Sequence, residues 1–188
     1  MPFASSAFRP RFMAVIVLAA GLFLAAGVRP SMAAGVNPIM LSPNQQMVYL
    51  YVGILNTADE IALRNEHFLL NTLQAMTQKR ASLDMVGLAA RTAYITRVAA
   101  TNMLHKYLIV PKGLPPKIIE VLKQSQTLSI EASKAKQNSI EALLLYLKDT
   151  KDLKAFENYQ TKLKRQERLA ADAAKHLEVV RRQVGLPD

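Results

Sequence analysis

The sequence predicts an all-α protein: an antiparallel four-helix bundle with long helices, preceded by a signal peptide. Apolar residues recur at intervals of three and four over four long stretches, which is typical of one buried face of a helix. Proline and glycine separate some of these stretches, and few segments alternate with a period of two for long enough to form a strand. We expect a single helical-bundle domain at 34–188, with helices at about residues 43–76, 78–109, 115–148 and 150–184.

The first 33 residues have the features of a secretory signal peptide. Arg9 and Arg11 precede an apolar run at 12–28, and Ser31 and Ala33 provide small residues at positions −3 and −1 of a cleavage site. We therefore expect cleavage after Ala33 and a periplasmic or secreted mature protein. The alternative is an uncleaved membrane anchor, because the 17 residues of the apolar run are just enough to span a bilayer.

Composition narrows the functions open to the mature chain. The chain has no cysteine, which excludes disulfides, thiolate metal sites and iron–sulfur clusters. Of its 24 basic residues three lie within 1–33, so 21 basic and 14 acidic residues leave a net charge of +7. In an exported protein this charge favours an acidic envelope protein or an anionic envelope surface as the partner, and not nucleic acid.

Three local signals predict where the first helix begins. Ser42 is a good N-cap, Pro43 suits the first turn, and Gln45 completes a capping box. The stripe predicted to be buried follows at a spacing of three and four, and a second row widens it. The stripe is Met47, Tyr51, Ile54, Ala58, Ile61, Phe68 and Ala75, and the widening row is Leu55, Ala62, Leu69, Leu73 and Met76.

The start of the second helix is less clearly marked, because no glycine or proline lies in 70–86. Thr77 and Ser82 are both candidate caps, and equal helix lengths place the turn near Met76. One continuous helix over 43–109 is the alternative. The second stripe is Leu83, Val86, Ala90, Ala93, Ala100, Leu104 and Tyr107.

Arg97 interrupts this second stripe. Asp59, Glu60, Glu66, Arg64 and Arg91 are further charged residues that could pair with it or with one another between the first two helices. We expect Arg97 to reach the edge of the bundle or to meet a carboxylate, with a buried functional cation as the alternative.

Three prolines and a glycine in 110–116 separate the second helix from the third. The third stripe is Ile118, Val121, Ser125, Leu128, Ala132, Ala135, Ser139, Ala142 and Tyr146. Ser125, Ser129 and Ser133 form a row of small side chains, four residues apart, that favours close approach of a neighbouring helix. A ligand niche is the alternative.

The fourth helix has the apolar heptad pattern of a coiled coil. Gln166 is the only polar member of its seam, and Gly185 with Pro187 predicts its end. The seam is Phe156, Tyr159, Leu163, Gln166, Ala170, Ala173, Leu177, Val180 and Val184.

The most regular polar feature is a row of four basic residues on this fourth helix, which we call the basic row: Lys164, Arg168, Lys175 and Arg182. These positions face away from the seam, so the row is either a solvated face or a partner-binding face. No catalytic or metal-binding motif is found: no Glu-x-x-His, no His-Glu-x-x-His and no nucleophile elbow. We expect no catalytic residue and no cofactor.

Together these features predict an exported, non-catalytic binding or assembly module of the bacterial envelope. The alternative is a periplasmic four-helix bundle that binds a b-type haem or another small ligand. Met47 and His176 would then be the axial ligands, because the start of the first helix and the end of the fourth meet in an up-down-up-down bundle. Asp172 lies four residues before His176, and we interpret these two as a surface pair.

Overall fold

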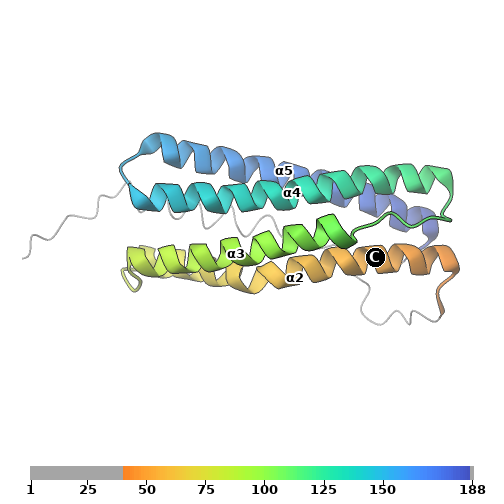
Figure 1. Ribbon diagram of the computed structural model, residues 1–188, viewed down its shortest axis with the longest axis horizontal. Coiled ribbons are helices and arrows are strands. Elements are labelled where there is room, and N and C mark those ends of the chain that lie inside the picture. The colour runs from red at the N-terminus through yellow and green to blue at the C-terminus, as the bar shows by residue number, and fades with distance from the viewer. Residues whose placement is uncertain (1–39, 187–188) are drawn as a thin grey trace, which may run out of the picture.

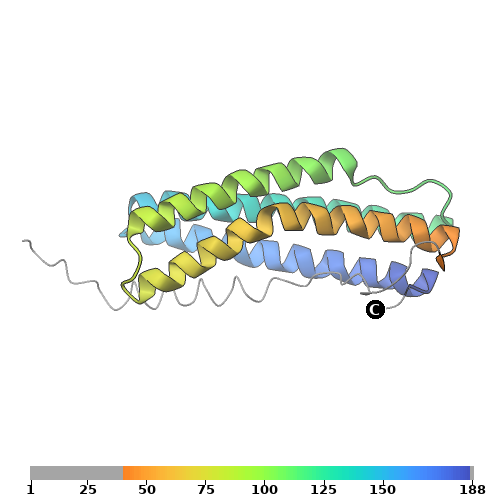
Figure 2. The same cartoon turned by 90° about the horizontal axis from the view of Figure 1, so that it is seen from below.

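A computed structural model describes residues 40–186, which fold into four α-helices with no strand. The helices run alternately up and down the long axis of the bundle and lie side by side (Figures 1 and 2). The all-α class and the four helices are therefore confirmed, while the predicted signal peptide lies outside the described residues. The helices are α2 (Pro43–Thr77), α3 (Leu83–Tyr107), α4 (Pro116–Lys148) and α5 (Leu153–Val184).

The predicted capping box at the start of α2 is confirmed. The backbone N–H of Ser42 donates to Gln45 Oε1 at 2.9 Å, and the backbone N–H of Gln45 donates to Ser42 Oγ at 3.4 Å. Gln45 Nε2 also donates to the carbonyl of Gly185 at 2.9 Å. This contact joins the start of α2 to the end of α5, at the same end of the bundle (Figure 1).

The turn between α2 and α3 is later than expected. The second helix begins at Leu83, not at 78, because Ser82 is its N-cap and accepts a hydrogen bond from the N–H of Met85 at 3.2 Å. Thr77 is instead the last residue of α2. With no glycine available, Lys79 adopts a left-handed backbone with a φ of 59° and reverses the chain.

The last helix also begins later than expected, at Leu153 and not at 150. Asp152 is its N-cap, since its Oδ1 accepts from the N–H of Lys154 at 2.9 Å and of Ala155 at 3.0 Å. Gly185 ends the helix in the left-handed conformation with a φ of 71°, as its sequence position predicted. The remaining helix ends lie within two residues of the expected ones.

The buried face of α2 corrects the predicted stripe. Ile61 and Phe68 are exposed by 40% and 50%, whereas Ala62 and Leu69 of the widening row are fully buried. The buried residues Val48, Leu55, Ala62, Leu69 and Met76 are also seven apart, so the predicted spacing is right. The row that contains Ile61 and Phe68 lies one position before them, about 100° around the helix, and therefore at the edge of the buried face. In α3, Leu83 and Tyr107, the ends of the second stripe, are exposed as well.

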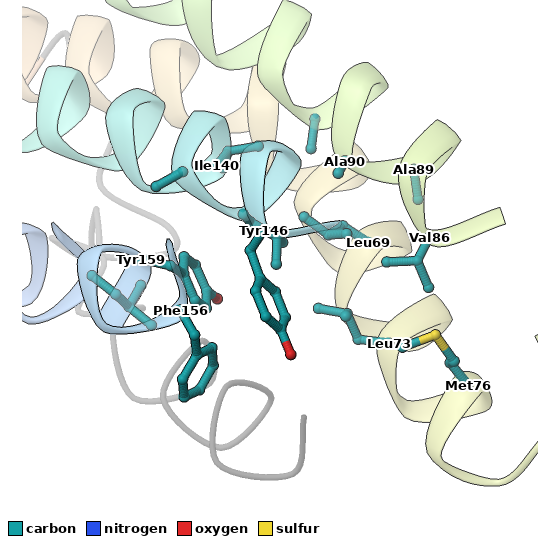
Figure 3. Close-up of a cluster of buried hydrophobic side chains, with 14 residues drawn as sticks. Leu69, Leu73, Met76, Val86, Ala89, Ala90, Ile140, Tyr146, Phe156 and Tyr159 are labelled. Carbon is teal, nitrogen blue, oxygen red and sulfur yellow. The ribbon is translucent and has the colours of Figure 1, made fainter. Parts of the chain in front are cut away.

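The apolar core consists of two main clusters at opposite ends of the bundle. Figure 3 shows the first, where Tyr146 of α4 lies beside Phe156 of α5 with ring centroids 5.3 Å apart. This cluster contains Leu69, Leu73, Met76, Val86, Ala89, Ala90, Ala93, Ile140, Ala142, Leu143, Tyr146, Phe156, Tyr159 and Leu163. The second contains Val48, Tyr51, Val52, Leu55, Ala58, Leu104, Leu108, Leu114, Ile118, Leu122, Leu177 and Val180.

The serines of α4 lie where it packs against its neighbours. Ser125 is fully buried, and its Oγ lies 3.5 Å from the carbonyl of Ala173 on α5. Ser133 is buried against α3, and Ser129 is half-buried. Close helix approach therefore accounts for Ser125. Among residues 40–186, no helix combines the length and apolar content needed to cross a membrane.

Candidate functional site

A layer of polar side chains interrupts the apolar core between its two main clusters. Three helices contribute two residues each, at spacings that place both on the same side of their helix. We call this set the polar layer: Asp59 and Glu66 of α2, Arg97 and Thr101 of α3, and Ser133 and Lys136 of α4.

Arg97 and Glu66 form the centre of the polar layer. Arg97 Nε and Nη2 lie 2.7 Å and 2.6 Å from Glu66 Oε1, and each of these residues is only 2% exposed. Lys136 Nζ lies 2.6 Å from the other carboxylate oxygen, Oε2. One buried carboxylate therefore binds two cations from two other helices.

Asp59 connects this centre to solvent. Its side chain is 55% exposed, and its Oδ1 accepts from Arg97 Nη1 at 3.1 Å. Ser133 Oγ lies 3.5 Å from the same Nη1 and 2.9 Å from Thr101 Oγ1. The two cations and two carboxylates balance one another, so the layer is electrically neutral although most of it is buried.

The surroundings shift the pKa values of the two central groups in opposite directions. Burial alone raises the pKa of Glu66, but Lys136 and Arg97 outweigh burial and lower it below its usual value. Burial alone lowers the pKa of Arg97, but the carboxylates of Glu66 and Asp59 raise it. Both groups are therefore held in their charged forms.

This arrangement positions helices. Removal of Glu66 or Arg97 would leave a buried charge without its partner, which costs several kcal/mol, so the layer favours the one register of α2, α3 and α4 that brings these charges together. A shift of one helix by a turn, about 5.4 Å, would separate them.

The expectation that Arg97 meets a carboxylate is confirmed, with Glu66 and Asp59 as the carboxylates, whereas the expectation that it reaches the edge of the bundle is wrong, because Arg97 is buried. Glu60, Arg64 and Arg91 are exposed and lie outside the layer. Sequence reasoning missed Thr101, Ser133 as a polar partner, and Lys136. One sequence signal does point to Lys136, a cation beside the predicted seam residue Ala135, although it does not show which carboxylate it meets.

The basic row lies on the outer face of α5, where all four residues are exposed. Two of them form ion pairs with acidic residues of the same helix. Lys175 Nζ lies 3.5 Å from Asp172 Oδ1, and Arg182 pairs with Glu178. The row is thus accessible, but its charge is partly offset by its own helix.

The two residues of the haem hypothesis lie in half-buried positions. Met47 packs against the second apolar cluster, close to the loop at Gly113. His176 bonds through Nδ1 to the backbone carbonyl of Asp172 at 2.8 Å, so the expected side-chain pair between these two is replaced by a backbone contact. The carboxylate of Asp172 lies near Lys175 instead.

Within residues 40–186 no cluster of three or more His, Asp or Glu side chains is arranged to hold a metal ion. Comparisons with protein-family models, with curated proteins and with solved structures found no match to this chain.

Proposed function

We propose that this protein is an exported, non-catalytic helical-bundle module that binds an acidic partner protein in the bacterial envelope. The observation that carries the proposal is the exposure of the whole basic row on one face of α5. At 100° per residue its four side chains fall within about 40° of one another and extend over about 27 Å. A row of this kind fits an elongated acidic surface.

The distribution of charge supports the choice of α5. This helix contains eight basic and four acidic residues, so it holds four of the seven net positive charges of the mature chain. The polar layer is neutral and internally paired. The excess positive charge at the surface is therefore concentrated on α5, where it attracts an acidic partner and orients its approach.

Charge reversal tests the basic row. Lys164, Arg168, Lys175 and Arg182 are changed together to Glu, and the protein with its bound partners is purified from native envelope and identified by mass spectrometry. A matched control reverses four exposed lysines outside α5: Lys112, Lys117, Lys123 and Lys134. We expect an acidic protein to be lost from the first variant and kept by the control. Retention of that protein by the first variant would remove α5 from the proposal.

An anionic membrane surface is the competing partner. Vesicle binding distinguishes a membrane surface from a protein partner. Binding is compared between vesicles of phosphatidylglycerol with phosphatidylethanolamine and vesicles of phosphatidylethanolamine alone. A protein that binds the anionic vesicles, loses this binding in the basic-row reversal, and co-purifies with no acidic protein would contradict the proposed partner. That combination of results would replace the protein partner with a lipid surface.

The mass of the purified protein tests the predicted export and cleavage. The intact mass of the protein purified from native envelope should correspond to a chain that starts at Ala34, as the cleavage site predicts. A mass that still includes the apolar run 12–28 would mean a membrane-anchored bundle.

The haem hypothesis is tested on the same material. A Soret band that is lost in both Met47→Ala and His176→Ala would make a b-type haem bundle the better assignment. A colourless preparation would count against haem and leave the binding module in place.

A further inference from the structure

A groove lined by both apolar and charged side chains lies on the outer surface between α3 and α4, on the side of these helices that faces away from the core. It has a volume of about 610 Å³. Leu88 of α3 and Leu145 of α4 lie in it and are 63% and 50% exposed. Large apolar side chains that share an open groove are typical of a surface that binds another macromolecule.

Four charged residues stand around these two leucines in a regular pattern. On α3 the order is Asp84, Leu88, Arg91, and on α4 it is Glu141, Leu145, Lys148. Both helices therefore have an acid, a leucine four residues later and a base seven residues after the acid. All four charged side chains are exposed and line the groove.

Because α3 and α4 are antiparallel, the two orders run in opposite directions along the groove. Asp84 lies at the start of α3 beside Lys148 at the end of α4, and Arg91 lies beside Glu141 about 10 Å further along. Positive and negative corners thus alternate around an apolar centre. Among the described residues, none of these four side chains forms an ion pair with another part of the chain.

A glycine within the groove also fits an external partner. Gly87 lies inside α3, where glycine costs about 1 kcal/mol relative to alanine. A Cβ added there would meet no atom of the protein within 4 Å, so the fold itself does not need glycine at this position. A small residue at this point lets a second helix approach closely.

We propose that this groove is the self-association surface of the protein, and that its occupant is the same groove of a second copy of this chain. An alternating four-corner pattern is self-complementary. When two copies meet face to face about a twofold axis that runs along or across the groove, every corner faces a corner of opposite charge, and the leucines meet in the centre. The result is an apolar centre with a charged rim, the usual anatomy of a protein interface.

The two possible axes predict different ion pairs. An axis along the groove pairs Asp84 with Lys148 of the second copy, and Arg91 with Glu141 of the second copy. An axis across the groove pairs Asp84 with Arg91 of the second copy, and Glu141 with Lys148 of the second copy.

Sedimentation equilibrium tests the proposal. The full chain is expressed, the protein is purified, and the mass of one protomer is taken from mass spectrometry. We expect a dimer that dissociates on dilution and weakens as salt is raised. Leu88→Glu and Leu145→Glu should each weaken it by more than about tenfold, because each places a charge in the centre of the interface. The matched control is Leu50→Glu, since Leu50 is 67% exposed on α2 and lies outside the groove.

Charge exchange then identifies the axis. Arg91→Glu should weaken the dimer. If the axis runs along the groove, adding Glu141→Arg restores the dimer. If the axis runs across the groove, adding Asp84→Arg restores it. Gly87→Gln places a longer side chain in the groove, at a position where an added Cβ meets no atom of the fold within 4 Å, and it should remove the dimer while the helical circular dichroism signal is kept. A protein that stays monomeric at all concentrations, an equal effect of Leu50→Glu, or the failure of both exchanges to restore association would overturn the proposal.

Discussion

Glu66 Oε1 lies 2.6 Å from Arg97 Nη2 inside the core, and each residue is only 2% exposed. This ion pair joins α2 to α3, and Lys136 brings α4 to the same carboxylate. A buried ion pair contributes little net stability compared with well-packed apolar residues, but removal of only one of its two partners costs several kcal/mol. The polar layer is therefore best tested by changes that remove one charge and leave its partners in place.

Removal of the central carboxylate should strongly destabilise the protein. Glu66→Gln keeps the size of the side chain but leaves Arg97 and Lys136 buried near a neutral amide, and we expect a loss of about 3–5 kcal/mol in the free energy of unfolding. The control is Asp59→Asn. The side chain of Asp59 is 55% exposed, so its carboxylate should contribute less than about 1 kcal/mol to the free energy of unfolding. Urea denaturation followed by circular dichroism measures both. Equal losses in the two variants would contradict the central role of Glu66.

The stability of the protein should fall in acid because of the same carboxylate. Burial raises the pKa of Glu66, but Lys136 and Arg97 lower it further, so the folded-state pKa lies below the ordinary value of 4.5. The unfolded chain then binds a proton at higher pH than the folded chain does. The contribution of Glu66 is present above about pH 4.5 and is lost as the pH falls through the lowered folded-state pKa.

The measurement is the free energy of unfolding at a series of pH values from neutral into the acid range. We expect Glu66→Gln to lose stability less steeply than the wild-type protein over this range, since it no longer has the carboxylate to protonate. Parallel curves for the two proteins would show that the acid sensitivity comes from other groups.

A larger side chain at the contact between α4 and α5 should also destabilise the fold. Ser125 is fully buried and its Oγ lies 3.5 Å from the carbonyl of Ala173, so Ser125→Leu forces neighbouring side chains out of their preferred rotamers. We expect a cost of roughly 1–3 kcal/mol. Ser129→Leu is the comparison, because Ser129 is half-buried on the same helix and should cost less. A neutral Ser125→Leu would instead favour the ligand niche.

Replacement of the one polar seam residue of α5 should stabilise the protein. Gln166 is 3% exposed, and among the described residues no donor reaches its Oε1. Gln166→Met keeps the volume and removes a buried acceptor, so the free energy of unfolding should rise by about 1–3 kcal/mol. The same change at the exposed Gln183 should have almost no effect. If Gln166→Met lowers the melting temperature, the amide makes a hydrogen bond that stabilises the fold.

The helix ends show how far local sequence determines this fold. Ser42, Pro43 and Gln45 predicted the start of α2, and Gly185 predicted the end of α5, because these signals act within one turn of the backbone. The start of α3 was misplaced by five residues. The chain reverses before α3 through Lys79, whose backbone is in the left-handed conformation, and a lysine gives no recognisable turn signal in the sequence.

The apolar spacing alone determined that the protein is all-helical and that each helix buries one face. Tertiary packing decided which residues of that face enter the core, since Ile61 and Phe68 are exposed whereas Ala62 and Leu69 are buried. Packing also decided that Lys136 meets Glu66, a residue 70 positions earlier in the chain. A helix repeats its spacing whatever lies beside it, so its sequence specifies a face but not a neighbour. Only the assembled bundle brings buried charges from three helices to one point.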